Sequence, residues 1–531
     1  MNASYNHPIR PFGRALVGAP TGAESAEFDR YAIQDLGVPQ ETLMENAGRS
    51  AALILQRLFP RGPVTALVGT GNNGGDALVL LRNLAAWGRP VTAILVGERE
   101  GDDEDLLHGW GIRTFLDSDF QDQDSLLFGE LAQAEVLVDG VLGTGISGPP
   151  RERQARMIRA MNGSEAPVVA LDIPSGVDAV TGAVPGDAVE AAATVAFGGA
   201  KLGGLLHPGR VNVGRLVVVE IGFPPVGEDT FQSVLVTPGW VTRRLPHRDP
   251  DTHKNAVGAL LLVAGRPGMA GAAILAARAA LRSGVGFLRV ASPPENRSII
   301  QQAVPEAVYV DASDPEALEE AVRASQALGM GPGMGTEEEA ETLLNRVLEV
   351  AGDQNLLLDA DALNLLAEGR GPKLKDVCRC RPVILTPHPG EMARLTGKKT
   401  EEITRARPEA ARELAEKNRC TVLLKGMPSL VAAPWGTILV DTVASSDLAA
   451  AGMGDVLSGA VAGFLAQGST PEEGGALGLH LSGRAGAMTG LGVSLTPEDV
   501  VEALPDSIRA QGEGETDLDL SFVLFDQDPP R

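Results

Sequence analysis

The sequence predicts an α/β protein with two successive domains, each built around a largely parallel β-sheet. The chain has 531 residues, which is more than a single hydrophobic core usually accommodates. Short, almost continuous apolar runs alternate with segments of helical periodicity, as in parallel sheets that helices cover on both faces. The 64 glycines and the aromatic content of 4% suit compact folds with many tight strand–helix turns.

A first series of buried strands starts at Val64. The run VTALVG is followed by a helical pattern over Asp76–Trp87, and further apolar runs return at intervals. This alternation indicates a Rossmann-like, doubly wound domain. The predicted strands are Val64–Gly69, Pro90–Gly97, Glu135–Leu142, Pro167–Ile173 and Arg215–Ile221.

The pattern restarts after the proline- and glycine-containing segment Gly222–Asp229, which indicates a second α/β domain. We therefore divide the chain into domains of residues 1–229 and 230–511. Residues 512–531 are acidic and nearly free of hydrophobic pattern, so we expect a disordered tail. Helices are expected over Ala270–Gly284 and after Gly454. Strands are expected at Gly258–Gly265, Phe287–Ser292, Asn355–Asp359, Pro382–Thr386 and Thr421–Lys425.

The formal net charge of −24 limits the kinds of partner. Such an acidic chain is a poor candidate for binding nucleic acid or an anionic membrane. A nucleotide ligand is compatible with this charge, because helix N-termini bind phosphate without a basic surface. The 3 cysteines are too few for a disulfide framework or a four-ligand zinc site. The sequence has no signal-peptide core and no run of about 20 apolar residues, so we expect a cytoplasmic protein.

Two amides, two glycines and an acid follow the first predicted strand, in the segment Asn72–Asp76. Glycines at a strand–helix turn let the backbone approach a ligand closely, and the helix N-terminus offers free N–H groups. The alternative is a tight turn before a helix that Asp76 caps.

Further polar residues lie at the ends of later strands in the first domain. Ligands of open α/β sheets bind outside the carboxyl ends of the strands, so Asn73, Asp139 and Ser175 are expected at one edge. Their oxygens suit a hard cation. Asp172 is a candidate general acid or base there, with Lys201 as its candidate partner.

The motifs MENAG, GNNGGD, VDGVLGTG and DIPSG occur in this order. Over roughly Ala23–Pro224, the chain resembles the NAD(P)H-hydrate epimerase family. The resemblance implies interconversion of the R and S forms of hydrated NADH or NADPH (NADHX and NADPHX). It also implies potassium at Asn73, Asp139 and Ser175, a substrate contact at Asp172, and a catalytic role for Lys201. The implied hydrate-binding residues are Asn72, Asn73, Gly74, Gly75, Asp76, Gly143, Thr144, Gly145, Ile146, Ser147, Gly148 and Pro149.

A glycine-rich segment with one acid, Ala451–Gly459, begins the last long apolar helical pattern. Backbone N–H groups at such a helix start can form an anion hole for a phosphoryl group. Asp455 can accept a proton from a hydroxyl that attacks phosphorus, or it can simply cap the helix. Other loops at strand ends favour the catalytic interpretation: Gly268–Ala273, Gly329–Gly335, Asp359–Asn364, Thr386–Glu391 and Leu424–Ser429.

This set, with the motifs HKNAVG, GMGPGMG, DADALN, TPHPGE and GMGDVLSG, resembles the ADP/ATP-dependent NAD(P)H-hydrate dehydratases of the ribokinase-like superfamily. The match runs from about Leu245 to Gly512. It implies that ADP phosphorylates the substrate hydroxyl with Asp455 as base, that phosphate is then eliminated, and that magnesium bridges the phosphates. The implied contacts of the S-form hydrate are Ala273, Gly335, His388 and Asp455. The implied contacts of the nucleotide are Lys425, Gly426, Met427, Pro428, Ser429 and Gly454.

Both domains in this order are similar to the bifunctional NAD(P)H-hydrate repair enzymes, many of which are homo-oligomers. The chain departs from the family pattern at several positions: Ala77 replaces a glycine, Met453 replaces the threonine of GTGD, and Ser429 replaces the threonine of KGxxT. The loop before the last long helix, VASSDLAAAG, also differs from the usual one. We expect Ala77 to be harmless, because it falls at the expected helix start. Met453 cannot bond phosphate as a threonine hydroxyl can. A ribokinase-like small-molecule kinase and a degenerate nucleotide-binding protein are the alternative functions.

Overall fold

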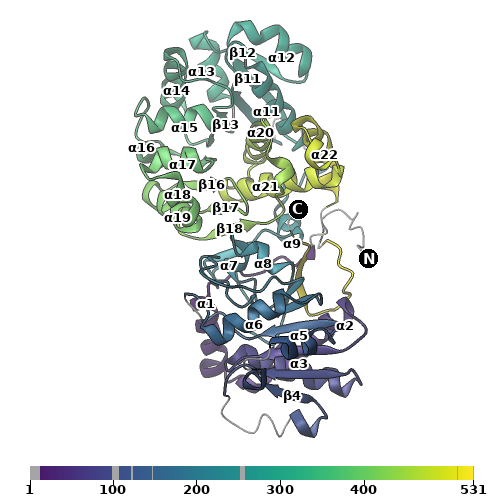
Figure 1. Cartoon of the computed structure of the whole chain (residues 1–531). Helices are drawn as coiled ribbons and strands as arrows, with labels where there is room; N and C mark the ends of the chain where they lie inside the picture. Colours follow the sequence, from purple (N-terminus) through teal and green to yellow (C-terminus); the bar gives the residue numbers. More distant parts are fainter. Residues whose placement is uncertain are drawn as a thin grey trace. The chain divides into compact units, whose positions relative to one another are not determined.

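The computed structural model describes residues 12–98, 107–120, 124–145, 148–251, 257–510, 512 and 514–529. The chain forms two compact units, coloured along the sequence in Figure 1. The N-terminal unit comprises Arg10–Val234 and Gly514–Pro530, and the C-terminal unit contains Leu235–Glu513. The border lies inside strand β9 (Ser233–Leu235), a few residues beyond the predicted position.

A nine-stranded sheet with the order β1-β19-β8-β7-β6-β5-β2-β3-β4 forms the core of the N-terminal unit. The strands from β8 to β4 are parallel, and β2, β3, β5, β6 and β7 are buried along their whole length. This burial explains the continuous apolar runs in the sequence. The strands are β1 (Phe12–Gly13), β2 (Val64–Val68), β3 (Val91–Leu95), β4 (Arg113–Leu116), β5 (Val136–Gly140), β6 (Val168–Leu171), β7 (Ala193–Phe197), β8 (Arg215–Val219) and β19 (Val523–Gln527).

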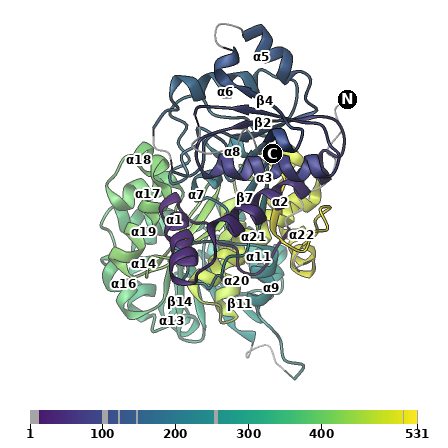
Figure 2. The ribbon, with the colours of Figure 1, turned by 90° about the horizontal axis from the view of Figure 1, so that it is seen from below.

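The helices of this unit include a closely packed pair, α2 and α3, which lie side by side in Figure 2. A side chain at Gly75 would collide with Met44, so the glycine permits this close approach. The helices are α1 (Gly22–Arg30), α2 (Gln40–Leu58), α3 (Asn72–Ala86), α5 (Asp124–Leu131), α6 (Glu152–Asn162), α7 (Leu202–Leu205) and α8 (Arg210–Val213).

The predicted disordered tail was wrong, because the end of the chain forms strand β19 of the N-terminal sheet. β19 pairs antiparallel with β8 on one side and with β1 on the other. Val523 and Phe525 are buried, and Asp526 lies 2.7 Å from Arg215 in an ion pair. The acidic composition of this segment led to the wrong prediction, because the strand's Asp526 is paired with Arg215 in the folded unit.

The C-terminal unit contains a ten-stranded sheet with the order β12-β11-β10-β13-β14-β15-β16-β17-β18-β9. The strands from β12 to β16 are parallel, and β17 and β18 continue the sheet as an antiparallel meander. Besides β9, the strands are β10 (Ala259–Val263), β11 (Phe287–Ser292), β12 (Val308–Asp311), β13 (Ala327–Met330), β14 (Asn355–Leu358), β15 (Val383–Leu385), β16 (Thr421–Leu424), β17 (Ser429–Ala432) and β18 (Ile438–Asp441).

Helices α11, α20, α21 and α22 pack together against this sheet, with the other long helices elsewhere around it (Figure 1). α11 and α20 can approach closely because residue 459 is a glycine. A side chain at this position would collide with the Ala276 backbone. The helices are α9 (Pro238–Arg244), α11 (Ala270–Arg282), α12 (Arg297–Ala303), α13 (Pro315–Arg323), α14 (Glu338–Val350), α15 (Ala360–Ala367), α16 (Leu374–Cys380), α17 (Pro389–Thr396), α18 (Thr400–Arg405), α19 (Arg407–Asn418), α20 (Met453–Ala466), α21 (Pro471–Thr489) and α22 (Pro497–Arg509).

Candidate functional site

The N-terminal unit contains a cavity of about 370 Å³ at the carboxyl edge of its parallel strands. Its polar lining includes Asp29, Asn72, Asp76 and Lys201. Its apolar lining is aromatic on one side, where Phe28 contacts two other rings at centroid distances of 5.1 Å. Those rings belong to Phe223 and Phe231.

Lys201 and Asp172 form a buried ion pair beside this cavity. Lys201 Nζ lies 2.6 Å from Asp172 Oδ1 and also donates hydrogen bonds to the carbonyls of Phe197 and Gly199. Asp172 has a positive φ of 62°, a backbone conformation that is costly for a residue with a side chain. The strained turn after β6 therefore directs this carboxylate to the lysine.

Two further carboxyl groups of the cavity share the electrostatic field of this pair. Burial raises the pKa of Asp76 well above its usual range, and the negative charges of Asp172 and Asp29 raise it further. Burial also raises the pKa of Asp29, an effect that the positive charge of Lys201 opposes. The site thus combines the Lys201 cation with three carboxyl groups, an arrangement able to store and transfer a proton. Nothing in the sequence pattern had indicated Asp29, which lies on the polar helix α1.

Asn73, Asp139 and Ser175 meet at the same edge of the sheet. The fully buried Asp139 carboxylate accepts hydrogen bonds from the Ser175 hydroxyl at 2.6 Å and the Ser175 N–H at 2.8 Å. The Asn73 amide nitrogen donates to the carbonyls of Leu142 and Leu171. This orientation leaves Asn73 Oδ1 buried and without a hydrogen-bond partner among the described residues. Burial raises the pKa of Asp139 to about 6.

This oxygen-lined pocket fits a hard cation. A buried carboxylate and an orphaned buried amide oxygen both gain from a bound positive charge. The donor set contains carboxylate, hydroxyl and amide oxygens, which suit an alkali or alkaline-earth ion better than a transition metal.

The helix after β2 starts earlier than predicted, at Asn72 instead of Asp76. Its N-cap is Gly71, so Asp76 does not cap the helix and its buried side chain lines the cavity. Ala77 lies inside α3, fully buried and without a positive φ, so it does not strain the turn.

The other predicted hydrate contacts of this unit lie near Asn73. Gly74 and Gly75 donate their N–H groups to the Gly71 carbonyl, and Gly143 lies beside the Asn73 side chain. Thr144 adjoins Gly22 at the start of α1. Gly145, Gly148 and Pro149 follow in an exposed turn, and Ile146 and Ser147 lie outside the described residues.

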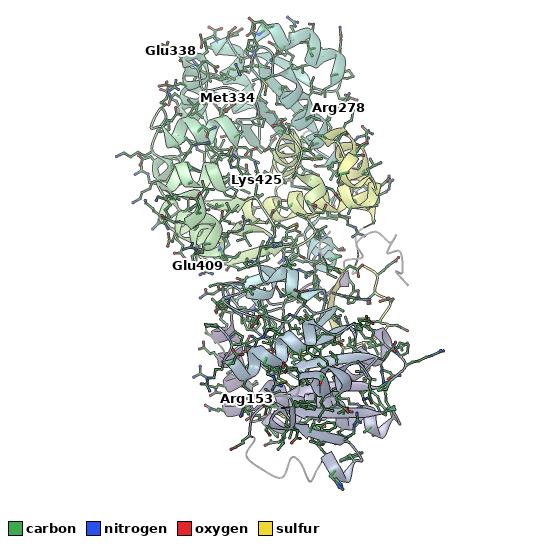
Figure 3. All side chains as sticks on the ribbon, in the orientation of Figure 1. Arg153, Arg278, Met334, Glu338, Glu409 and Lys425 are labelled. Atoms are coloured by element: carbon green, nitrogen blue, oxygen red, sulfur yellow. The ribbon has the colours of Figure 1, made fainter. Side chains whose placement is uncertain are left out.

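In the C-terminal unit, a second buried ion pair lies beneath the N-terminus of α20. Lys425 Nζ at the end of β16 lies 2.6 Å from Asp359 Oδ1 at the end of β14. The other Asp359 oxygen accepts a hydrogen bond from the hydroxyl of Ser458. Lys425 Nζ is also close to Gly454 in the first turn of α20. Figure 3 labels Lys425 in this central part of the unit.

Asp455 is the third residue of α20 and does not cap it, since Gly452 with φ of 92° occupies the N-cap. Burial raises the pKa of Asp455 to about 6, and the charges of Asp359 and Asp361 raise it while that of Lys425 lowers it. A carboxylate with a raised pKa beside free helix N–H groups is suited to accept a proton from a hydroxyl.

His388 takes the N-cap of α17, a role that the sequence did not indicate. Its Nδ1 accepts hydrogen bonds from the N–H groups of Gly390 and Glu391, at 2.9 Å and 3.3 Å. The neutral ring therefore carries its proton on Nε2. The side chain is 52% exposed, so this N–H can meet a ligand.

Arg407 stabilises the loop Lys425–Ser429 through hydrogen bonds to the loop backbone. The sequence did not indicate this residue. The buried Arg407 guanidinium donates to the carbonyls of Pro428 at 2.8 Å and Lys425 at 3.2 Å. Burial lowers the pKa of Arg407 to about 10, so the group stays charged. The Ser429 hydroxyl is bonded to the backbone of Gly426 within the same loop.

The remaining predicted residues come from α11, the loop after β13 and the start of α20. Ala273 is fully buried on α11, next to the turn that contains Gly265. Gly335 follows β13 with φ of 82°, and its N–H donates to Asp361 at 2.7 Å. Met453 packs against the apolar cluster of α11 and α20, so its side chain makes a hydrophobic contact.

Comparison with known proteins assigns both units. Residues 40–203 match the family described as YjeF-related protein N-terminus, and residues 260–506 match the family described as NAD(P)H-hydrate dehydratase. The bifunctional NAD(P)H-hydrate repair enzyme Nnr of Salinibacter ruber is 36% identical over 516 residues, which cover 90% of this chain and 93% of that protein. The chain belongs to the family of bifunctional NAD(P)H-hydrate repair enzymes.

Another repair enzyme agrees with this assignment, and one solved dehydratase structure is similar to part of the chain. The repair enzyme Nnr of Moorella thermoacetica is 35% identical, covering 88% of this chain and 91% of that protein. An ADP/ATP-dependent NAD(P)H-hydrate dehydratase from Bacillus subtilis, co-crystallized with ATP and Mg²⁺, is 32% identical. The match covers 52% of this chain and 98% of the dehydratase chain, with a TM-score of 0.46.

Family membership confirms the predicted fold class and the predicted bifunctional enzyme, and the kinase and binding-protein alternatives are not favoured. As in the prediction, an epimerase domain precedes a dehydratase domain along the repair-enzyme chain. Within the described ranges, none of the helices has both the length and the apolar character needed to span a bilayer.

Proposed function

We propose that the chain repairs hydrated nicotinamide nucleotides in two steps. The N-terminal unit interconverts the R and S forms of NADHX and NADPHX, and the C-terminal unit dehydrates the S form with ADP, giving AMP and phosphate. The observation that carries the proposal is Asp455, a carboxyl group with a raised pKa in the first turn of a helix, beside the Lys425–Asp359 pair. Its position suits a base at a phosphoryl-transfer site.

Dehydration converts a poor leaving group into a good one. Asp455 accepts the proton of the substrate hydroxyl, whose oxygen attacks the terminal phosphorus of ADP while the bond to AMP breaks. The carbon–oxygen bond of the new phosphate ester then breaks, phosphate leaves with the electron pair, and loss of a ring proton restores the double bond. N–H groups around Gly454 and the cation of Lys425 offset the developing charge.

Ala273, Gly335 and His388 hold the S-form hydrate on one side of Asp455, and Lys425–Ser429 with Gly454 hold ADP on the other. Arg407 keeps the nucleotide loop in position through its hydrogen bonds to the loop carbonyls. Magnesium would bridge the phosphates and neutralise their charge.

Epimerisation requires one bond of the hydrated carbon to break and to re-form on the opposite face, with a proton transferred to and from the departing group. Asp172 acts beside that carbon, and Lys201 holds the Asp172 carboxylate in place. The segment Asn72–Asp76 and the loop Gly143–Pro149 hold the nucleotide. Potassium would be held by Asn73, Asp139 and Ser175, since the orphaned Asn73 oxygen and the buried carboxylate suit it.

We place the reaction in the cytoplasm, because all three cysteines are free and two of them, Cys378 and Cys420, are buried. Assembly into a homo-oligomer stays a prediction from the resemblance, which light scattering would check.

The proposal is tested by mixing purified protein with NADHX of both forms, magnesium, potassium and ADP, and following the absorbance of NADH. We expect complete conversion of both forms. Arrest once the S form is exhausted would refute the epimerase assignment. Absence of NADH with ADP and also with ATP would refute the dehydratase assignment, and a stable phosphorylated product would support the kinase alternative.

A further inference from the structure

A cavity of about 810 Å³ lies at the edge of the C-terminal sheet, apart from the residues discussed so far. Its walls come from the loops that follow four adjacent parallel strands, β12, β11, β10 and β13, and from the start of α14. This is the carboxyl edge, at which open α/β sheets bind ligands. The volume is in the range of ligand sites, about 300–1,000 Å³.

The cavity adjoins the residues proposed to hold the reacting end of the hydrate. Gly265 on its wall is next to Ala273, and Met334 on its wall precedes Gly335. Gly335 in turn is bonded to Asp361, whose charge acts on Asp455. A ligand that reaches Asp455 past Ala273 and Gly335 therefore extends into this cavity. Figure 3 labels Met334 and Glu338 on this part of the unit and Lys425 nearer its middle.

The order of strands leaves one direction for the rest of the hydrate. ADP is assigned to the loop after β16. The charges of Lys425, after β16, and Asp359, after β14, act on Asp455. On its other side β14 neighbours β13, the strand that precedes Gly335. NADHX consists of two nucleotides, of which only the nicotinamide one reacts. With the ADP side occupied, its adenosine diphosphate half must continue toward β10, β11 and β12.

Part of the lining suits that half of the molecule, and its acidic residues, Glu295, Glu337, Glu338 and Glu339, lie beside two arginines. Pro293, Pro294, Pro315, Leu318 and Met334 offer an apolar surface for adenine. Two arginines offer donors for a diphosphate: Arg266 lies 3.2 Å from Glu337, and Arg346 lies 3.4 Å from Glu319. Both pairs are about half exposed, and exposed pairs are weak, so either arginine can exchange its carboxylate for phosphate.

We propose that this cavity is the subsite for the adenosine diphosphate half of the hydrated dinucleotide during dehydration. The proposal rests on the proposed function, since it assigns a second part of the same substrate. Arg346 is then a residue that binds substrate without touching the reacting atoms.

The test compares NADHX with the hydrate of reduced nicotinamide mononucleotide, which lacks the second nucleotide. For the wild-type protein, the KM of the mononucleotide hydrate should exceed that of NADHX by about tenfold or more. Arg346→Ala should raise the KM of NADHX about tenfold, retain kcat, and leave the KM of the mononucleotide hydrate and of ADP unchanged. Arg323→Ala is the matched control, because Arg323 also pairs with Glu319, at 3.7 Å, but does not line the cavity. It should change none of these values.

Equal KM values for the two hydrates in the wild-type protein would overturn the proposal. So would an Arg346→Ala effect that is the same for both hydrates, or one that falls on ADP instead. Absence of NADH formation from NADHX would differ from all of these results, because it would refute the proposed function itself.

Discussion

Lys425 Nζ lies 2.6 Å from Asp359 Oδ1, so the ammonium group nearest the start of α20 is already paired with a carboxylate other than Asp455. Burial and the charges of two neighbouring carboxylates raise the pKa of Asp455 to about 6, although the charge of Lys425 lowers it. The pair thus provides positive charge for a phosphoryl group while Asp455 remains basic enough to take a proton.

The first prediction is that Asp455→Asn lowers kcat for dehydration about 10²-fold to 10⁴-fold, because the amide cannot accept the proton. Epimerisation should be retained and is measured by chromatography of the R and S forms without ADP. Retained formation of NADH would remove Asp455 from the role of base. Thermal unfolding is the folding control: the variant should unfold at the wild-type temperature or higher, since the native site disfavours the charged carboxylate.

The second prediction concerns pH. Because the base must be ionised and its pKa is raised to about 6, kcat/KM for dehydration should be constant above pH 7 and fall as the pH drops through 6. His388→Asn is the control, since histidine ordinarily titrates near this pH and asparagine also caps helices well. The acidic fall should persist in that variant. Its disappearance would assign the titration to His388.

The third prediction is that Asp172→Ala blocks conversion of the R form and leaves dehydration of the S form unchanged. Lys201→Met should have the same effect on activity and should also destabilise the protein by about 3 kcal/mol, because it leaves a partly buried carboxylate unpaired. Stopped consumption of R with normal consumption of S is the expected progress curve. Equal loss of both activities would indicate misfolding or a wrong assignment of the unit.

The fourth prediction is that potassium stabilises the N-terminal unit and activates epimerisation. Replacing potassium by tetramethylammonium at constant ionic strength should lower the midpoint of thermal unfolding and slow the exchange of R and S. Asn73→Ala removes the orphaned oxygen, so its unfolding midpoint should no longer respond to potassium. An unchanged response of this variant would place the ion elsewhere.

The fifth prediction is that a chain ending at Gly512 loses stability in its N-terminal unit. The truncation removes β19 and the ion pair of Asp526 with Arg215, and it exposes the edges of β8 and β1. Epimerisation should become thermolabile while dehydration survives the same heating. As a control, Phe525→Ala keeps the strand but removes a buried ring and should cost about 3–5 kcal/mol. Unchanged thermal behaviour of both variants would show that β19 contributes nothing.

Much of the fold could be predicted because buried parallel strands have a strong apolar signal. Asp139, Asp172 and Lys425 were therefore placed correctly at the ends of strands. Asp29 and Arg407 could not be predicted, since each lies on a helix, and a single charge on a helix ordinarily faces solvent.

Helix starts and the last strand were harder for a different reason. The early start of α3 depends on Gly71 as N-cap, a residue with no side-chain signal. Strand β19 is short and lies in an acidic segment, and it pairs with β8, which is about 300 residues earlier in the chain. Such pairing becomes visible only in three dimensions.

The position of β19 also has a consequence for biosynthesis. Ribosomes complete the first 229 residues long before the closing strand emerges, so the epimerase sheet must wait with an open edge while the whole dehydratase is translated. A gene cut at the border between the units would leave the first product without its last strand and the second with an orphaned one. The topology therefore favours a single gene for the two units. Separate genes would require a redesigned sheet edge at β8 and β1.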